Sequence, residues 1–363
     1  MLDSIKKIAV NMLTGACAMT SLLLVAVGFS DHVDPVDYPS LACLGMTFPF
    51  FVVANLVMLI VMLLFKWKRA WVPLLGFAFA YVPIRTYLPI HARAELPDSC
   101  IKVMSYNVCG YGGNYKYEKG VDTVAAYIRR IDPDIVCLQE EQFFGSGSNP
   151  VEVMKTIYAY NDTTLLTPPD VEYANILGIH TRYPILKKER LAYTSECNGS
   201  VAYFLQVGQD TLIVINNHLE STHLSTDDRD HYKQVINGDM ERQAAGEEAL
   251  HILDQLGVGM LKRAVAANVV HQYIVDHSDY PLIVCGDFND TPISYSRRLI
   301  SQSLTDCFVE SGCGLGLSFN QIGFTFRIDH MMCSSHFRPY NCTVDSEMDA
   351  SDHNPLFCWL KRQ

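Results

Sequence analysis

Residues 281–290 read PLIVCGDFND, and the fold of the second part of the chain is most easily inferred from them. The apolar run 282–285 is followed at once by glycine, aspartate and asparagine, which is typical of a buried strand whose end carries polar side chains. Short apolar runs of the same kind recur at 101–108, 135–138, 176–179, 202–207, 211–216 and 355–360. They indicate further strands, several of them buried on both faces.

Helical patterns separate some of these strands. Apolar residues at positions 121, 124, 125, 128 and 131 form a one-sided stripe. A longer helical stretch covers about 240–277, and we expect a break in it near Gly257 and Gly259. Because strands and helices interleave without a strict β-α-β rhythm, the sequence predicts an α/β sandwich with mixed sheets.

Ten of the twelve cysteines lie beyond residue 95. They form no CxxC pair, which argues against a zinc ribbon. We expect most of them to be small buried apolar residues. An oxidising compartment would permit disulfides, and the pairs suggested by proximity in sequence are Cys333 with Cys342 and Cys307 with Cys313.

The first 95 residues have a different composition. Three apolar runs lie at about 8–29, 41–65 and 70–90, and each is long enough to cross a bilayer core of about 30 Å as a helix. A cleaved signal peptide is the rival interpretation of the first run, but that run is longer than the usual ~15 apolar residues and two more follow. We therefore expect a transmembrane anchor of three spans in residues 1–95 and a separate catalytic domain in residues 100–363.

Charged residues at the ends of these runs predict the orientation of the anchor. Basic residues precede the first run and separate the second from the third, whereas acidic residues separate the first from the second (Lys6, Lys7; Lys66, Lys68, Arg69; Asp31, Asp34, Asp37). Cytoplasmic loops are enriched in lysine and arginine. The N-terminus is therefore expected in the cytoplasm, and an odd number of spans places the catalytic domain outside it, in the periplasm or its equivalent.

The charge of the chain is uneven. Residues 1–95 hold seven basic and five acidic side chains, a net charge of +2, so the remaining chain must carry −13 to give the total of −11. Such an acidic body is a poor electrostatic partner for nucleic acid unless a metal ion or a local basic patch intervenes.

Polar side chains recur where the predicted strands end. They are Asn107, Glu140, Asn217, His218, Asp287, Asn289, Asp329, Asp352 and His353. An aspartate at a strand end is by itself more often a turn former than a ligand, but strand ends in open α/β folds meet at one rim. Carboxylate and amide oxygens suit Mg²⁺ or Mn²⁺, and histidine beside carboxylate suits proton transfer near neutral pH.

Six short motifs carry a resemblance to a known family. They are SYN at 105–107, LQE at 138–140, NHLES at 217–221, GDFND at 286–290, RIDH at 327–330 and SDHNP at 351–355. In this order they resemble the endonuclease/exonuclease/phosphatase superfamily, which includes deoxyribonucleases, neutral sphingomyelinases and inositol-polyphosphate 5-phosphatases. The resemblance implies a four-layer α/β sandwich, with two packed mixed sheets flanked by helices, and hydrolysis of phosphoesters with Mg²⁺ or Mn²⁺. The N-terminal segment with its three apolar runs resembles that of membrane-anchored members from Bacteroidetes-type bacteria.

The resemblance also implies roles for individual residues. Glu140 would be the principal metal ligand, with Asn107 and Asp352 nearby. Asp287 and Asn289 would orient the attacking water and the phosphate. The group that takes the proton from this water stays open.

The remaining roles concern proton transfer and the substrate. His353, held by Asp329, would be a general acid or base, and His218 would donate to a phosphoryl oxygen or assist the leaving group. Asn175 and Asn217 would contact substrate. Residues 221–259 resemble an insertion, either a loop lining the cleft or a solvated excursion.

Several functions are compatible with these motifs. The first is a membrane-anchored, metal-dependent phosphodiesterase or phosphatase acting on nucleic acid, a lipid head group or a small phosphoester, with a sphingomyelinase-like enzyme set against a nuclease. The second is a non-catalytic membrane-tethered binding module that kept the fold, but that reading predicts lost ligands and all the matched positions are intact. A transporter is a weaker third reading, because three spans are few for one. No protein partner is predicted.

Overall fold

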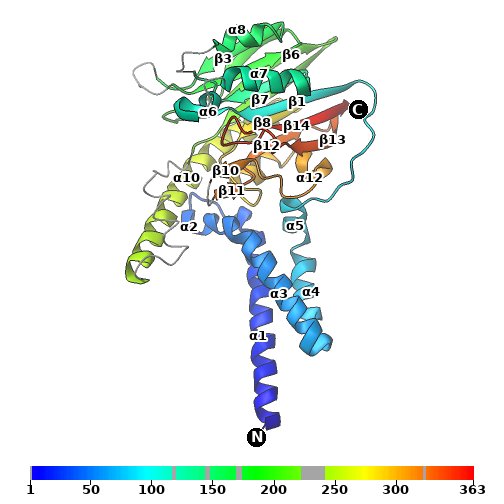
Figure 1. Cartoon of the computed structure of the whole chain (residues 1–363), viewed down its shortest axis with the longest axis vertical. Coiled ribbons are helices and arrows are strands. Elements are labelled where there is room, and N and C mark those ends of the chain that lie inside the picture. Colours follow the sequence, from blue (N-terminus) through cyan, green and yellow to red (C-terminus); the bar gives the residue numbers. More distant parts are fainter. Residues whose placement is uncertain (1, 117–119, 144–147, 169–173, 222–241, 322–323) are drawn as a thin grey trace.

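The computed structural model describes residues 2–116, 120–143, 148–168, 174–221, 242–321 and 324–363. Apolar N-terminal helices extend away from an α/β body, which begins at β1 (Cys100–Asn107) and ends with β14 (Leu356–Arg362) (Figure 1). The body contains two six-stranded sheets, and a short hairpin is formed by β10 (Phe319–Gln321) and β11 (Phe324–Phe326).

Both large sheets are mixed. The strand order is β13-β14-β1-β2-β4-β3 in the first and β5-β6-β7-β8-β12-β9 in the second. One central pair in each sheet is parallel, β1 with β2 and β7 with β8, and the other pairs are antiparallel. The remaining bounds are β2 Ile135–Gln139, β3 Tyr160–Leu165, β4 Ile176–Thr181, β5 Ile185–Arg190, β6 Gly199–Val207, β7 Asp210–His218, β8 Leu282–Asp287, β9 Thr305–Asp306, β12 Asp329–Cys333 and β13 Phe337–Val344.

Three apolar cores hold the layers together. The middle core lies between the two sheets and includes Val103 and Val214. A second core joins the first sheet to α7 (Gly120–Ile131) and α8 (Pro150–Lys155). A third joins the second sheet to α10 (Arg242–Asp276) and α11 (Tyr295–Ile300). The layers are therefore helix, sheet, sheet and helix, which confirms the predicted sandwich.

All seven strands predicted from the sequence are present, as β1, β2, β4, β6, β7, β8 and β14. The one-sided stripe is the buried face of α7. The expected break near Gly257 and Gly259 is wrong, because α10 is continuous. Gly257 instead allows α10 to pack closely against Pro39, since a Cβ at this position would lie 3.2 Å from Pro39 Cβ. Of the expected insertion, residues 222–241 lie outside the described residues, and residues 242–259 belong to α10.

The cysteines behave as small apolar residues. All twelve are free thiols, so neither suggested disulfide, Cys333 with Cys342 or Cys307 with Cys313, is formed. Eight of the twelve are buried, and six of these belong to the core between the sheets. Their packing explains them without a metal or a bridge.

Two N-terminal helical segments, Lys7–His32 and Pro39–Arg69, are long and apolar enough to cross a membrane. Their main helices are α1 (Leu2–Gly28) and α3 (Phe48–Lys66). Only 28% and 17% of their most apolar windows are buried inside the protein. They therefore differ from the core helices of the body, which are covered by other elements.

The prediction of a third span is wrong. Residues 70–90 contain two short helices, α4 (Trp71–Phe79) of 9 residues and α5 (Tyr81–Tyr87) of 7 residues. Proline has no N–H, so Pro83 cannot donate to the carbonyl of Phe79, and the helix is interrupted between the two. Two apolar helices of spanning length are therefore present in this part of the structure, rather than three.

The N-terminal helices run up and down beneath the body. Figure 1 shows α1 rising toward the body, α3 leading away from it and α4 with α5 returning to it. η1 (Ser30–His32), α2 (Pro39–Ala42) and η2 (Cys43–Thr47) link α1 to α3 at the body end. At the far end Arg69 donates to Thr14 Oγ1 at 2.7 Å, which places the turn after α3 beside α1.

The body and the N-terminal helices are packed against each other at a junction. A Cβ on Gly45 of η2 would lie 1.9 Å from the carbonyl oxygen of Ile293. Arg298 Nε donates to the Asp31 carbonyl at 2.8 Å. Arg327, which is 2% exposed, donates to the carbonyls of Thr86 in α5 and Leu315. We call this contact region the anchor junction.

Candidate active site

The polar strand ends meet at one rim of the sandwich. Because β1 and β2 are parallel neighbours and β7 and β8 are too, their carboxyl ends lie together in each sheet. Asn107, Glu140, His218 and Asp287 stand at or directly after these ends. Contacts between side chains of opposite sheets show that the two edges form a single site, called the catalytic rim below.

Asn107 connects the two sheets at this rim. Its Nδ2 lies 3.1 Å from Glu140 Oε1 and 3.0 Å from Asp287 Oδ2. Asp287 is 1% exposed, and burial, reinforced by Asp329 and opposed by His353, raises its pKa to about 6. Two carboxylates from different sheets therefore share one amide in a space that largely excludes water.

The backbone is unusual at two of these positions. Glu140 has a φ of +52°, in the left-handed region that L-residues other than Asn and Asp rarely occupy. Asn289 has a φ of +50°, which asparagine adopts more readily. Gly286 has a φ of +136°, and a Cβ there would lie 2.0 Å from the carbonyl oxygen of Asn217. Such conformations persist only where the surroundings enforce them, and they cluster at functional sites.

His353 is held by two carboxylates. Its Nδ1 lies 2.8 Å from Asp329 Oδ2, and its Nε2 lies 3.6 Å from Asp287 Oδ2. Burial disfavours the charged imidazole, but Asp329 and Asp287 outweigh that effect and raise the pKa of His353 to about 10. The pairing of Asp329 with His353, inferred from the RIDH and SDHNP motifs, is thus present in the structure.

His218 also lies near Asp287, and it lies near Glu140 as well. Its Nε2 is 3.7 Å from both Glu140 Oε1 and Asp287 Oδ2, and its Nδ1 is 3.0 Å from Asn175 Nδ2. Burial lowers the pKa of His218 and outweighs the attraction of Asp287. The pKa values of the two histidines are therefore shifted in opposite directions, that of His353 upward and that of His218 downward.

Asn289 and Asp352 approach the rim through their segments. The backbone N–H of Asn289 donates to Asp287 Oδ1 at 2.8 Å, and its Nδ2 donates to the Leu219 carbonyl at 2.9 Å. Ser351, the neighbour of Asp352, donates to the Asn107 carbonyl at 2.8 Å. These contacts bring the GDFND, NHLES, SYN and SDHNP motifs to one place.

The side chain of Asn217, a predicted site residue, does not join this group. Its Oδ1 accepts from the Ser200 hydroxyl at 2.7 Å, and its Nδ2 donates to the Cys285 carbonyl at 2.9 Å. Side chains alternate between the faces of a strand. His218 points toward the rim, so the preceding asparagine faces the opposite side of the sheet.

Two supporting contacts were missed from the sequence. Gln139 Nε2 donates to Asn216 Oδ1 at 2.6 Å and so joins the two sheets beneath the rim. Arg263 of α10 is 2% exposed, lies 3.3 Å from Asp290 and donates to the Glu220 carbonyl at 3.0 Å. An arginine inside an otherwise apolar helical stripe was the available signal for this second contact.

The residues present fit a divalent cation. Glu140 and Asp287 supply carboxylate oxygens, and Asn107 supplies an amide, the donors that Mg²⁺ and Mn²⁺ prefer. Asp329 Oδ1 is buried and accepts no hydrogen bond among the described residues. A second possible donor set, formed by Asp287, Asp329 and His353, has ligand atoms within 4.8 Å of one another. Several buried carboxylates with few countercharges favour a bound cation at the rim.

Comparisons with known families agree with this geometry. The model of the Endonuclease/Exonuclease/phosphatase family matches residues 104–353, which is more than half of the chain. The model of a domain of unknown function (DUF8431) matches residues 10–87. No curated protein matches the sequence significantly.

Solved structures resemble the body in fold. Truncated TDP2 from Caenorhabditis elegans is 16% identical with a TM-score of 0.50, and the match covers 73% of this chain and 99% of that one. The human nocturnin catalytic domain with bound sulfate is 17% identical with a TM-score of 0.51, covering 73% and 95%. A protein from Bacteroides thetaiotaomicron with this family's name is 17% identical with a TM-score of 0.50, covering 73% and 98%. At these identities the similarity concerns the fold alone.

Proposed function

The chain belongs to the endonuclease/exonuclease/phosphatase family, and on that premise we propose that it is a membrane-anchored phosphoester hydrolase that depends on a divalent metal ion. The observation that carries this proposal is the direct contact of Asn107, Glu140, Asp287, His218 and the His353–Asp329 pair at one rim. A phosphoryl centre requires neutralisation of charge, an aligned nucleophile and protonation of the leaving group. The rim contains a group suited to each.

Mg²⁺ or Mn²⁺ would be held by Glu140 with Asn107 and Asp352. The ion would neutralise phosphate charge and polarise a phosphoryl oxygen. We favour this set over Asp287, Asp329 and His353, because His353 Nδ1 is already bonded to Asp329.

The side chains of the rim would then divide the remaining work. Protonated His353, held in place by Asp329, would donate hydrogen bonds to the phosphate and stabilise its negative charge. Asp287, whose pKa is raised to about 6, is suited to accept a proton from an attacking water, and Asn289 would help to orient that water. His218, neutral and held by Asn175, would contact the phosphoryl oxygen or the leaving group.

We further propose that the catalytic domain lies on the side of the membrane opposite the basic turn at Lys66, Lys68 and Arg69. This turn is beside the first half of α1, far along the helix from the body. The acidic loop between α1 and α3 contacts the body through Asp31 and Asp34. Because lysine and arginine are enriched on the cytoplasmic side, the body would be extracytoplasmic. This orientation requires the two short helices α4 and α5 to carry the chain back across the membrane together.

A lipid head group is the substrate class that we favour over nucleic acid. The net charge of the chain, −11, opposes binding of a polyanion. The segment that follows the GDFND motif packs on η2, since Ile293 touches Gly45. The catalytic rim is therefore built on a segment that rests on the N-terminal helices, which favours a phosphodiester located at a bilayer surface.

The experiment is hydrolysis by the full-length protein in detergent, with Mg²⁺, of a sphingomyelin-type lipid, single-stranded DNA and a small bis-phosphoester. Glu140→Gln is expected to abolish Mg²⁺-supported turnover of every substrate, because it removes a charged ligand of a hard cation. Glu152→Gln, on the exposed surface of α8, is the matched control and should retain activity.

Two outcomes would contradict the proposal. Full activity of Glu140→Gln, or wild-type activity that is undiminished in excess chelator, would remove the metal role. Absence of turnover with all three substrates, together with metal-dependent binding of one of them, would support the alternative of a non-catalytic binding module.

A further inference from the structure

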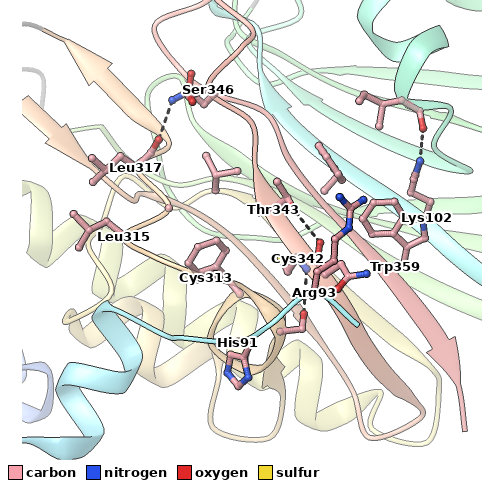
Figure 2. A pocket seen from close by; sticks show the side chains of 18 of the residues that line it. His91, Arg93, Lys102, Cys313, Leu315, Leu317, Cys342, Thr343, Ser346 and Trp359 are labelled. Atoms are coloured by element: carbon pink, nitrogen blue, oxygen red, sulfur yellow. Dashed lines mark hydrogen bonds between the residues drawn. The ribbon is translucent and has the colours of Figure 1, made fainter. Parts of the chain in front are cut away.

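A second hollow lies outside the catalytic rim. It has a volume of about 870 Å³ and opens between β13, β14, α12 (Cys307–Ser311) and the linker 88–99 that leads from α5 to β1 (Figure 2). None of the residues that meet at the rim lines this hollow. Asn354 does line it, and its Nδ2 donates to the Leu317 carbonyl at 2.9 Å. We call it the basic hollow, for the reason that follows.

The charges that line the hollow have one sign. The chain has 39 acidic and 28 basic side chains. Yet the lining among the described residues includes Arg93, Lys102 and Arg130, together with His91, and no aspartate or glutamate. A positive cavity on an acidic protein concentrates anions locally against the overall field.

The three cations retain donors for a ligand. Lys102 is half-buried, donates to the Ile131 carbonyl and lies 4.7 Å from the centre of the Trp359 ring. An ammonium has three N–H donors, and the Ile131 carbonyl accepts from one of them. Arg130 meets Glu347 at 3.5 Å in an exposed pair, which is a weak contact that a ligand can replace. Arg93, labelled in Figure 2 among the lining side chains, is an exposed residue of the linker.

The geometry points to a binding site for a phosphate monoester group in the basic hollow. Several cations around one cavity favour a dianion over a carboxylate, and the guanidinium fork of Arg93 matches phosphate oxygens in pairs. The inference is independent of catalysis at the rim, because it uses none of the rim residues.

Tryptophan fluorescence provides a local test. The chain has three tryptophans, Trp67, Trp71 and Trp359, and only Trp359 lines the hollow. The full-length variant Trp67→Phe/Trp71→Phe therefore has a single indole at the proposed site. We expect a saturable change in its emission when inorganic phosphate is titrated in excess chelator, and no such change with potassium chloride at equal ionic strength.

Charge-removing variants test the assignment. Arg93→Gln and Lys102→Gln should each weaken phosphate binding by at least ~10-fold, because each removes a charged donor. Arg338→Gln is the matched control, since Arg338 is an exposed arginine of β13 that does not line the hollow. Calorimetric titration of the same variants with native tryptophans gives a second readout if the single-tryptophan protein folds poorly.

The source of the phosphate forms a separate arm of the experiment. Vesicles of phosphatidylcholine with and without phosphatidic acid present the same group on a lipid. A response to free phosphate supports a soluble ligand, and a response only to phosphatidic acid supports a lipid head group. No saturable response to either, an equal response to chloride, or equal affinity in Arg93→Gln and Lys102→Gln would overturn the proposal.

Discussion

The catalytic rim and the anchor junction hold the same two segments of chain by different means. In the first segment, Asp287 and Asn289 belong to the rim, while Ile293 rests on Gly45 of the junction. In the second, Asp329 binds His353 at the rim, and Arg327, two residues earlier, donates to Thr86 at the junction. The rim relies on ionised side chains, whereas the junction relies on main-chain carbonyls, one glycine and one buried arginine.

This difference separates chemical from structural dependence. A carboxylate or an imidazole at the rim has no substitute, so its loss should stop one step of the reaction. A carbonyl is offered by every residue type, so a change at the junction alters how firmly a segment is held. We therefore expect rim variants to lower turnover with little change in stability, and junction variants to lower stability first.

The largest effect is expected for the pair of Asp329 and His353. Asp329→Asn and His353→Ala should each lower turnover by at least ~10²-fold, since Asp329 holds the imidazole of His353 in place to stabilise the charge on the phosphate. The double variant should be little worse than the worse single one, because groups that act as a unit are not additive. A double-mutant cycle on turnover at saturating Mg²⁺ measures this. If the two losses multiply, the residues act independently and their pairing has no catalytic meaning.

The second effect concerns Arg327. Arg327→Met keeps the apolar length of the side chain but removes the donors to the Thr86 and Leu315 carbonyls. Two lost bonds from a charged donor correspond to about 3 kcal/mol of stability. Thermal unfolding of the full-length protein in detergent measures it, with exposed Arg338→Met as the control. If turnover fell while the unfolding temperature stayed unchanged, Arg327 would contribute to the reaction at the rim rather than to the stability of the junction.

The third effect concerns the glycine of η2. Gly45→Ala would bring a Cβ to 1.9 Å from the Ile293 carbonyl oxygen, so the junction must shift. Overpacking of this kind costs about 1–3 kcal/mol. Gly15→Ala in α1 is the control, because nothing lies within 4 Å of its added Cβ. Equal unfolding temperatures for the two variants would mean that the contact between η2 and the body is not maintained in solution.

The smallest effect is expected for Arg298. Its Nε donates to the Asp31 carbonyl at 2.8 Å in a partly buried contact. Arg298→Ala should lower the free energy of unfolding by about 1 kcal/mol and leave turnover within about twofold, since one hydrogen bond is lost. Lys155→Ala, which breaks an exposed pair with Glu152 on α8, is the matched comparison. A larger loss of stability from Lys155→Ala than from Arg298→Ala would mean that the Arg298 bond does not stabilise the junction.

The rim was largely predictable from the sequence because its chemistry restricts residue types. Carboxylate, amide and imidazole groups at strand ends indicated Asn107, Glu140, Asp287, Asp329 and His353, and the resemblance to the family implied that Asp329 holds His353. The side chain of Asn217 does not join the rim, and the reason is geometric. The alternation of side chains along β7 sends it away from the rim, and its neighbour Asn216 joins the two sheets instead.

The junction could not be predicted in the same way. A glycine that touches a carbonyl and an arginine that donates to one leave no pattern in the sequence, since the acceptor can be any residue. Proline did carry a signal, because Pro83 interrupts the third apolar run at the point where α4 and α5 separate. Gly257 carried a misleading one, since it suggested a break in α10 where the structure has a contact with Pro39.

The bond between Arg327 and Thr86 has a practical consequence for expression. A fragment that begins at residue 100 would lack the Thr86 carbonyl and leave the buried guanidinium with one acceptor fewer. It would also uncover Met260 of α10 and Ile293, which pack against residues of the N-terminal helices. Such a truncated fragment is expected to aggregate or to show altered kinetics even with every rim residue intact. Refolding yields and specific activities of truncations should therefore be judged against the full-length chain.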